Sequence, residues 1–590
     1  MSAHDPHSYA DFSQGRIVHL AFDISVDFSS RVLDIATQFQ LQAPATGPLH
    51  LDSRNLEILW VRCAGGPVAF EKDASDPILG ERLCLQLPAG TEQFSIGCRT
   101  SAQADALQWL APQHTAGGAH PFLFSQCQAI HARSLFPCQD TPSVRFTYEA
   151  RVSVPAGLSV VMAAERTGHD RDGERDLFTF RMPQPIPSYL FALAAGDLVF
   201  QRIGERTGVY AEPSVLEAAA WEFGENEQRL EAAERLLGPY LWDRYDLLIM
   251  PPSFPYGGME NPRLTFVTPL VILGDRSRTW LITHELAHAW TGNLITNATW
   301  EDFWLNEGWT TYADSRITEA LDGPDFARLG DLLSVRDLEE DLRSFGLTSE
   351  RTCLHASMRG VDPDQAFSVV PYIKGFLFLL SLERAAGRQA FDEFLRRYIS
   401  AFRFQSITTE EFLSFLRREL PDIGAKVDLD AWVYRPGLAE PLPELSSRLF
   451  EQVSLRVADF SAGHLPKGEE MRKWNPYQKG LFLKMLPEKI APADCQQIER
   501  SLGLHETRDS VLLYEFYRLA IRSGYQECLP GMERFAATVG RHYYLARFFR
   551  CLAENEWSRD LARPLFERVR SGHHPVTAAV VDHMLTQAGV

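Results

Sequence analysis

The feature that most constrains the fold is a pair of histidines with a distant glutamate. His284-Glu285-Leu286-Ala287-His288 carries two histidines four residues apart, and Glu307 follows after eighteen further residues. On a helix, side chains four apart project from one face, so both imidazoles can reach one metal ion while Glu285 stands beside them. With 17 histidines and 77 acidic residues among 590, about 0.06 chance HExxH matches are expected. The pattern therefore favours a metal-dependent hydrolase.

Three protein ligands with an open fourth position are typical of catalytic zinc. His284, His288 and Glu307 offer two nitrogens and one oxygen, which leaves the fourth tetrahedral position for water. Glu285 is the natural general base, and replacing it with Gln should abolish turnover while zinc stays bound. Asp314 shares the helical face of Glu307 and is expected to orient a zinc-bound imidazole, although a solvent-facing aspartate would give the same pattern. Histidines that merely pack in an apolar helix are the alternative explanation.

Charge and composition limit the class of protein. A formal net charge of -19 argues against a nucleic-acid partner, because such proteins bind phosphates with basic patches. The N-terminus does not resemble a secretory signal, and no apolar run is long enough to span a bilayer. The nine cysteines are odd in number and form no CxxC pair, which favours reduced thiols. We expect a cytoplasmic protein that does not bind membranes and is a monomer.

The hydrophobic pattern divides the chain into parts. Residues 1–197 alternate apolar and polar side chains, as in Leu20–Phe28 and Val144–Val154, which predicts a β-rich domain. Residues 198–434 mix helical and strand patterns. Residues 435–443 are rich in proline and read as a linker, and residues 444–590 predict stacked helices. The expected fold class is multidomain α+β.

A second motif gives the chain a resemblance to a known family. Gly257-Gly258-Met259-Glu260-Asn261 matches GxMEN, and Glu260 lies twenty-four residues before His284. Together with HExxH-x18-E, this motif resembles the gluzincin zinc aminopeptidases, and segments such as Phe124–His131 and Val370–Gly375 are most similar to the leukotriene A4 hydrolase branch. The resemblance implies a saddle-like β-rich N-terminal domain, a thermolysin-like catalytic domain and a solenoid-like helical C-terminal domain. It also implies one zinc ion per chain.

The resemblance assigns further roles within the catalytic region. Glu260 is expected to bind the free α-amino group of a peptide, and a buried carboxylate near zinc does need a cation to pair with it. Tyr372 occupies the position of a tyrosine that hydrogen-bonds the oxyanion. Substrate contacts are further implied for the residues around the GxMEN motif and in two other segments, namely Tyr256, Gly257, Gly258, Met259, Gln128, Ala129 and Asp364.

The chain also departs from this branch. Phe367 stands where the branch carries a second tyrosine, which weakens the case for handling an epoxide in the same way. Near the C-terminus, Ser558–Phe566 resembles the segment that binds a substrate carboxylate, but its lysine position is Asp560 and its arginine is displaced. Arg559 or Arg563 is expected to substitute, or the carboxylate is held more weakly.

The function that follows is a zinc aminopeptidase. We expect it to remove the N-terminal residue from short peptides with a free N-terminus, with Glu285 as base, Tyr372 as oxyanion donor and Glu260 as amine ligand. One alternative is an epoxide hydrolase that acts on a lipid epoxide at the same zinc. The other is a catalytically silent peptide-binding protein, which would have no need to retain the base and the oxyanion donor together.

Overall fold

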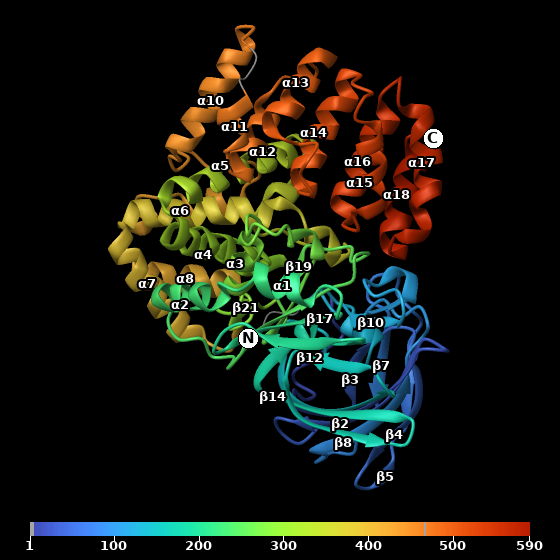
Figure 1. The fold of residues 1–590 in the computed structure, drawn as a ribbon. Coiled ribbons are helices and arrows are strands. Elements are labelled where there is room, and N and C mark those ends of the chain that lie inside the picture. The colour runs from blue at the N-terminus through green and yellow to red at the C-terminus, as the bar shows by residue number, and fades with distance from the viewer. Residues whose placement is uncertain (1–4, 465–467) are drawn as a thin grey trace.

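The chain folds into three parts that follow one another in sequence (Figure 1). The computed structural model describes residues 5–464 and 468–590. A β-sheet domain comes first, a mixed α/β domain, the expected catalytic domain, lies in the middle, and a bundle of helices ends the chain. This arrangement confirms the predicted fold class, while the limits at residues 197, 434 and 443 remain predictions.

The N-terminal domain consists of three sheets. The largest has the strand order β13-β14-β11-β1-β2-β8-β4-β5, and smaller sheets have the orders β12-β15-β10-β9 and β3-β7-β6. The strands are β1 (Ile17–Asp27), β2 (Val32–Leu41), β3 (Leu49–Ser53), β4 (Glu57–Cys63), β5 (Gly66–Pro67), β6 (Phe70–Lys72), β7 (Glu81–Leu85), β8 (Gln93–Arg99), β9 (Leu107–Leu110), β10 (Phe122–Ser125), β11 (Arg145–Pro155), β12 (Ser159–Met162), β13 (Glu165–Asp172), β14 (Arg175–Pro187) and β15 (Leu193–Gly196).

The predicted alternation sets the core of this domain. Along β1, Leu20, Phe22, Ile24 and Val26 are buried, because successive side chains of a strand point to opposite faces. Strand β1 pairs parallel with β11 and antiparallel with β2, so it lies inside the sheet. The short turn η3 (Ser188–Leu190) follows β14 and is fully buried.

The catalytic domain combines one five-stranded sheet with nine helices in the described residues. The sheet order is β16-β17-β18-β20-β19, and β21 pairs with β22 separately. The strands are β16 (Val199–Arg202), β17 (Thr207–Ala211), β18 (Tyr245–Ile249), β19 (Gly258–Met259), β20 (Leu264–Val267), β21 (Ile295–Asn297) and β22 (Gln405–Ile407). The helices are α1 (Leu216–Glu222), α2 (Asn226–Leu237), α3 (Trp280–Ala287), α4 (Trp304–Asp322), α5 (Pro324–Phe345), α6 (Gly375–Ala386), α7 (Arg388–Phe402), α8 (Thr409–Glu419) and α9 (Leu429–Tyr434).

The C-terminal domain is helical. Alternate helices pack on one another, α12 on α10, α14 on α12, α16 on α14 and α18 on α16, as expected for stacked helix pairs. The helices are α10 (Arg448–Ser461), α11 (Gly468–Arg472), α12 (Pro476–Met485), α13 (Pro492–Leu502), α14 (Ser510–Ser523), α15 (Leu529–Thr538), α16 (His542–Glu554), α17 (Arg559–Val569) and α18 (Pro575–Gln587).

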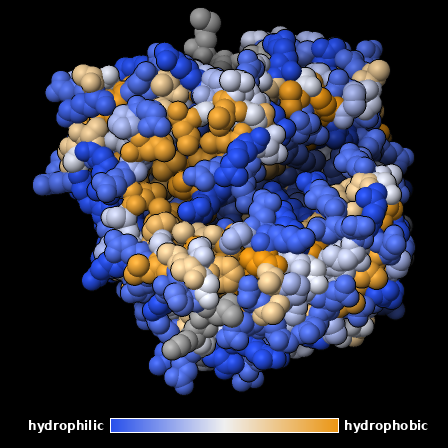
Figure 2. Space-filling view, turned by 90° about the horizontal axis from the view of Figure 1, so that it is seen from above, coloured by the Kyte–Doolittle hydropathy of each residue, from blue (hydrophilic) through white to orange (hydrophobic). Residues whose placement is uncertain are grey.

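The buried apolar residues form two clusters. One runs through the N-terminal and catalytic domains, and the other fills the C-terminal helices and includes Leu329 of α5. Seen from above, the surface is mostly hydrophilic, with hydrophobic residues gathered left of centre beside a hollow (Figure 2). No helix in the described part of the chain combines the length and apolar character needed to cross a membrane. All nine cysteines are free thiols.

Candidate metal centre and substrate site

The three predicted ligands converge on one point. His284 lies on α3, His288 caps the C-terminus of that helix, and Glu307 lies in the first turn of α4. Glu307 Oε2 is 3.4 Å from His284 Nε2 and 3.5 Å from His288 Nε2. The helical spacing of the two histidines and the packing of α3 on α4 therefore bring together two nitrogens and one oxygen.

This donor set fits zinc. Ligands about 2.1 Å from a tetrahedral ion lie about 3.4 Å from one another, which is close to the separations of Glu307 Oε2 from the two imidazole nitrogens. Glu307 Oε2 is buried and has no hydrogen-bond partner among the described residues. Burial holds the pKa of His288 well below its ordinary value, so the ring is neutral, the form that binds a metal.

Neighbouring side chains orient the two imidazoles. Thr310 Oγ1 lies 3.1 Å from His288 Nδ1, which leaves Nε2 of that ring for the metal. Asp314 Oδ2 lies 3.9 Å from His284 Nδ1, so the aspartate stands behind the ligand as the sequence predicted. Burial raises the pKa of Asp314 to about 7.

Glu260 and Glu285 border the same space. One carboxylate oxygen of each lies within 4.8 Å of the other and of a ring nitrogen of His288. Gly258 makes this approach possible, because a Cβ at that position would collide with the Glu285 carboxylate. The residue that follows β19, Glu260, and Glu285 on α3 thus each place one carboxylate beside the ligands.

Three carboxyl groups are buried together here, and each resists ionisation. Burial raises the pKa of Glu307 to about 8 and that of Glu285 to about 8. Burial, followed by the charge of Glu307, raises the pKa of Glu260 to about 8. Buried carboxylates without a counter-charge are costly, so this cluster is suited to hold cations.

Tyr372 lies at the edge of the ligand cluster. It belongs to the short π-helical segment η8 (Val370–Lys374), and its ring stacks on that of His284 at a centroid distance of 6.1 Å. Burial, together with the neighbouring Glu307 carboxylate, raises the pKa of its hydroxyl well above the ordinary value. The phenol is therefore a proton donor beside the ligands. Phe367 packs edge-on against Phe303 and provides no hydroxyl there.

The segment after β10 joins the site from the N-terminal domain. Gln128 Nε2 donates to Glu260 Oε1 at 3.2 Å. The backbone N–H of Ala129 donates to Asp364 Oδ1 at 3.4 Å, and His131 Nε2 lies 3.1 Å from Asp364 Oδ2. Met259 is buried on β19, and the ring of Tyr256 meets that of His542 edge-on. The structure thus brings these predicted residues into one neighbourhood.

The structure does not bring Arg559 and Arg563 to this site. Both lie on α17, where Arg559 donates to the carbonyls of Ala588 and Gly589. Arg563 donates to the carbonyl of Val590 at 2.8 Å and pairs with Asp582 on α18. Both guanidinium groups thus contact the C-terminal end of the chain, and these contacts give no support to the expectation that either anchors a substrate carboxylate.

Arg541 is the arginine that reaches the site. Its guanidinium stands 3.1 to 3.4 Å from the position of a Cβ on Gly257, and its charge lowers the pKa of Glu285, against the larger effect of burial. The guanidinium can reach this position because Gly540, the residue before it, packs against the backbone of Pro252 and Ser253. The sequence prediction missed it, since Arg541 belongs to a different domain and to no local motif. The one clue in the sequence was Gly540, whose lack of a side chain lets the segment before Arg541 pack closely against another part of the chain.

Fold and site together define a zinc metallopeptidase, and comparisons with known proteins agree. Residues 221–432 match the peptidase family M1 domain, residues 6–190 the peptidase M1 N-terminal domain, and residues 474–585 the leukotriene A4 hydrolase C-terminal domain. The chain belongs to the M1 zinc aminopeptidase family, in the branch that is similar to leukotriene A4 hydrolase.

Individual relatives cover nearly the whole chain. Leukotriene A-4 hydrolase of Xenopus laevis is 38% identical over 599 residues, which cover 98% of each chain. Leucine aminopeptidase 2 of Neurospora crassa is 36% identical over 604 residues, covering 98% of this chain and 90% of the relative. The native leukotriene A4 hydrolase structure from Saccharomyces cerevisiae superposes with a TM-score of 0.90 at 33% identity, covering 100% of this chain and 98% of that chain.

Proposed function

We propose that this enzyme removes the N-terminal residue from short peptides that carry a free α-amino group. One observation supports this proposal most. The carboxylates of Glu260 and Glu285 lie within 4.8 Å of each other and of His288, beside the zinc ligand set. A cationic amine at Glu260 would thus hold the first peptide bond next to both the metal and a base.

One zinc ion per chain would be held by His284, His288 and Glu307. When bound, it supplies Lewis-acid chemistry that polarises a carbonyl and lowers the pKa of water. The chain positions the ligands through Thr310 and Asp314, which face the outer nitrogens of the two imidazoles.

Glu285 would act as the general base. Its carboxylate takes a proton from the attacking water and delivers it to the leaving amine, a task that needs a pKa near the working pH. Burial raises the pKa of Glu285 to about 8, and nearby Arg541 opposes that rise. Glu285 is thus able both to accept and to return a proton near neutral pH.

Glu260 would select the free N-terminus. Gln128 donates to one of its oxygens at 3.2 Å and fixes the carboxylate in place. The substrate ammonium supplies the counter-charge that this buried group lacks, so a blocked amine should bind poorly. This selection separates an exopeptidase from a general peptidase.

Tyr372 would donate its phenol proton to the oxyanion that develops as water attacks. The proton remains on the phenol at neutral pH because burial raises its pKa.

The first substrate side chain would lie among Gln128, Ala129, Tyr256 and Met259, with Asp364 holding Ala129 in place.

Arg541 would bind the carboxylate of a short peptide. A guanidinium beside Gly257 is well suited to a bidentate contact with that group.

An epoxide substrate is less suited to the site, since Phe367 offers no hydroxyl. The nine free thiols suit a reducing cytoplasm, and we propose a monomer there.

The direct test is the substitution Glu285→Gln. We expect the turnover of aminoacyl arylamides to fall by about 1,000-fold, because general acid–base catalysis is lost. Zinc content, measured by mass spectrometry of the metal, should stay at one per chain. An active Glu285→Gln enzyme would refute the mechanism.

A further inference from the structure

A tyrosine from the N-terminal domain contacts both the turn after α3 and the residue that precedes Glu307. Tyr189 belongs to the turn η3, and its side chain is fully buried. Its hydroxyl donates to the carbonyl of Gly292 at 3.0 Å and lies 2.7 Å from Thr296 Oγ1. Its ring meets Trp300 edge-on at 5.4 Å. Tyr189 therefore reaches from one domain into the turn that follows the zinc helix of the next.

The same hydroxyl contacts the residue before a zinc ligand. Asn306 directly precedes Glu307, is fully buried, and donates from Nδ2 to the Tyr189 hydroxyl at 3.4 Å. The Asn306 side chain also acts on the Glu260 carboxylate, whose pKa it lowers against the larger effect of burial. Because an amide nitrogen carries two protons, one side chain can hold both partners at once. Asn306 thus links Tyr189 to the proposed amine ligand.

A second contact from the N-terminal domain reinforces the link. Arg145 on β11 donates from its guanidinium to the carbonyl of Asn293 at 2.9 Å. The Asn293 side chain donates to the backbone carbonyl of Glu260 at 2.7 Å. Both the backbone and the carboxylate of Glu260 are therefore tied to contacts that begin in the N-terminal domain.

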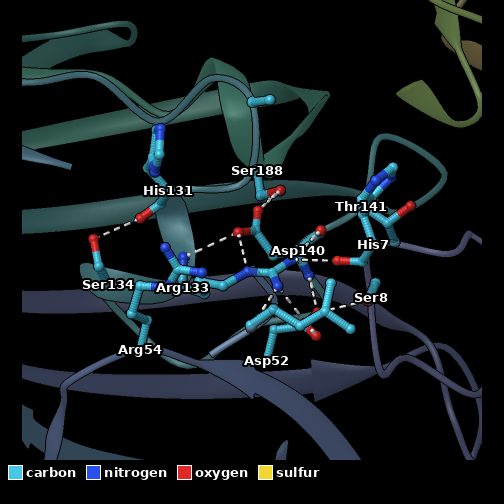
Figure 3. Close-up of polar contacts among 12 residues, drawn as sticks. His7, Ser8, Asp52, Arg54, His131, Arg133, Ser134, Asp140, Thr141 and Ser188 are labelled. Atoms are coloured by element: carbon cyan, nitrogen blue, oxygen red, sulfur yellow. Dashed lines mark hydrogen bonds and ion pairs between the residues drawn. The ribbon is translucent and has the colours of Figure 1, made fainter. Parts of the chain in front are cut away.

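A buried ion pair fixes the turn that carries Tyr189. Ser188 donates from Oγ to Asp140 Oδ1 at 2.7 Å, and Asp140 Oδ2 accepts from Arg133 Nε at 3.0 Å (Figure 3). Arg133 is fully buried and also donates to the carbonyl of His7 at 2.7 Å. Moving the turn would break the Ser188 hydrogen bond to a buried carboxylate, which is costly. The turn is therefore a firm support.

We propose that Tyr189 is a positioning residue for aminopeptidase activity, which holds Asn306, and through it Glu260, at the place where the substrate amine binds. It touches neither substrate nor metal. This inference rests on the proposed function, because it concerns the group that binds the amine. It makes the N-terminal domain a contributor to the geometry of the active site.

The test compares two buried tyrosines of the same domain. Tyr148 is also fully buried, and its hydroxyl donates to the carbonyl of Ala163 at 2.9 Å, within the N-terminal domain. We expect Tyr189→Phe to lower kcat/KM for aminoacyl arylamides by about 10-fold, mostly through KM, with zinc retained. Tyr148→Phe should stay within about 2-fold of the wild type while losing a similar hydrogen bond. Equal effects of the two substitutions on kcat/KM would overturn the proposal.

A double-mutant cycle tests the path through Asn306. If Tyr189 acts through that side chain, Tyr189→Phe should change kcat/KM by no more than about 2-fold in an Asn306→Leu background. A full 10-fold loss in that background would overturn the proposed path. Failure of the proposed function is seen separately, because the wild-type enzyme would then hydrolyse N-acetylated and free arylamides equally well.

Discussion

The catalytic domain meets its two neighbours in different ways. Toward the N-terminal domain it shares one continuous hydrophobic core, in which Phe124 and Phe254 contact edge-on at 5.5 Å. Toward the C-terminal helices, which have a core of their own, the contacts include ion pairs. Arg278 pairs with Asp509 at 2.6 Å, and both side chains are about 95% buried.

The N-terminal domain is therefore part of the structure that holds the zinc ligands in place, whereas the C-terminal domain is a separate packing unit. The zinc helices α3 and α4 lie in the shared core, so their geometry depends on the N-terminal domain, as the contacts of Tyr189 illustrate. The C-terminal domain instead has a separate core, to which the catalytic domain contributes Leu329 of α5, and it adds Arg541 to the site. We therefore expect the first two domains to unfold as one unit and the C-terminal helices to respond separately.

The largest expected effect comes from breaking the shared core. Trp300 is fully buried between Tyr189 and Phe303. Replacing it with alanine should cost about 4 kcal/mol, because a large cavity remains. In calorimetry, the transition of the N-terminal and catalytic domains should move down as one.

The matched control is Trp221→Ala on α1. Trp221 is 50% exposed, so its loss should cost about 1 kcal/mol or less. Two separate transitions for the first two domains in Trp300→Ala would contradict the shared core.

A somewhat smaller effect is expected at the ion pair between the catalytic and C-terminal domains. Arg278→Met leaves Asp509 buried without its partner, which should destabilise the C-terminal domain by about 3 kcal/mol. Hydrogen exchange should rise in α14 and leave β1 unchanged. The double variant Arg278→Met with Asp509→Asn should recover most of the loss, since asparagine still caps α14 and leaves no unpaired charge. Faster exchange throughout the N-terminal sheet would show that the boundary does not separate the domains.

The smallest effect is a pH dependence. Burial lowers the pKa of His574 from 6.5 to about 4, and its Nδ1 accepts from the backbone of Val576 at the start of α18. The unfolded chain then binds the proton more readily, so stability is complete above pH 6.5 and falls as the pH drops toward 4. The loss at pH 5 should be about 2 kcal/mol.

His574→Asn is the control for this prediction, because asparagine caps a helix without titrating. Thermal unfolding at pH 7 and pH 5 checks both proteins. An equal loss in His574→Asn would assign the pH dependence to other groups.

Local patterns made much of the site predictable. His284, Glu285 and His288 are related by helical spacing, and the alternation along β1 specified which of its faces is buried. Glu307 lies on the next helix, α4, and was found from its position in the sequence motif. Tyr372 needed the family resemblance, since one tyrosine among 17 carries no pattern. Arg541 and Tyr189 come from other domains, and no local periodicity encodes contacts over such separations.

The central claim is that Glu260 selects a free amine beside a zinc site that has Glu285 as its base. The most direct measurement is kcat/KM for a set of aminoacyl arylamides and their N-acetylated counterparts. We predict that acetylation lowers kcat/KM by at least about 100-fold, because Glu260 then faces no counter-charge. Equal hydrolysis of free and acetylated substrates would contradict the account.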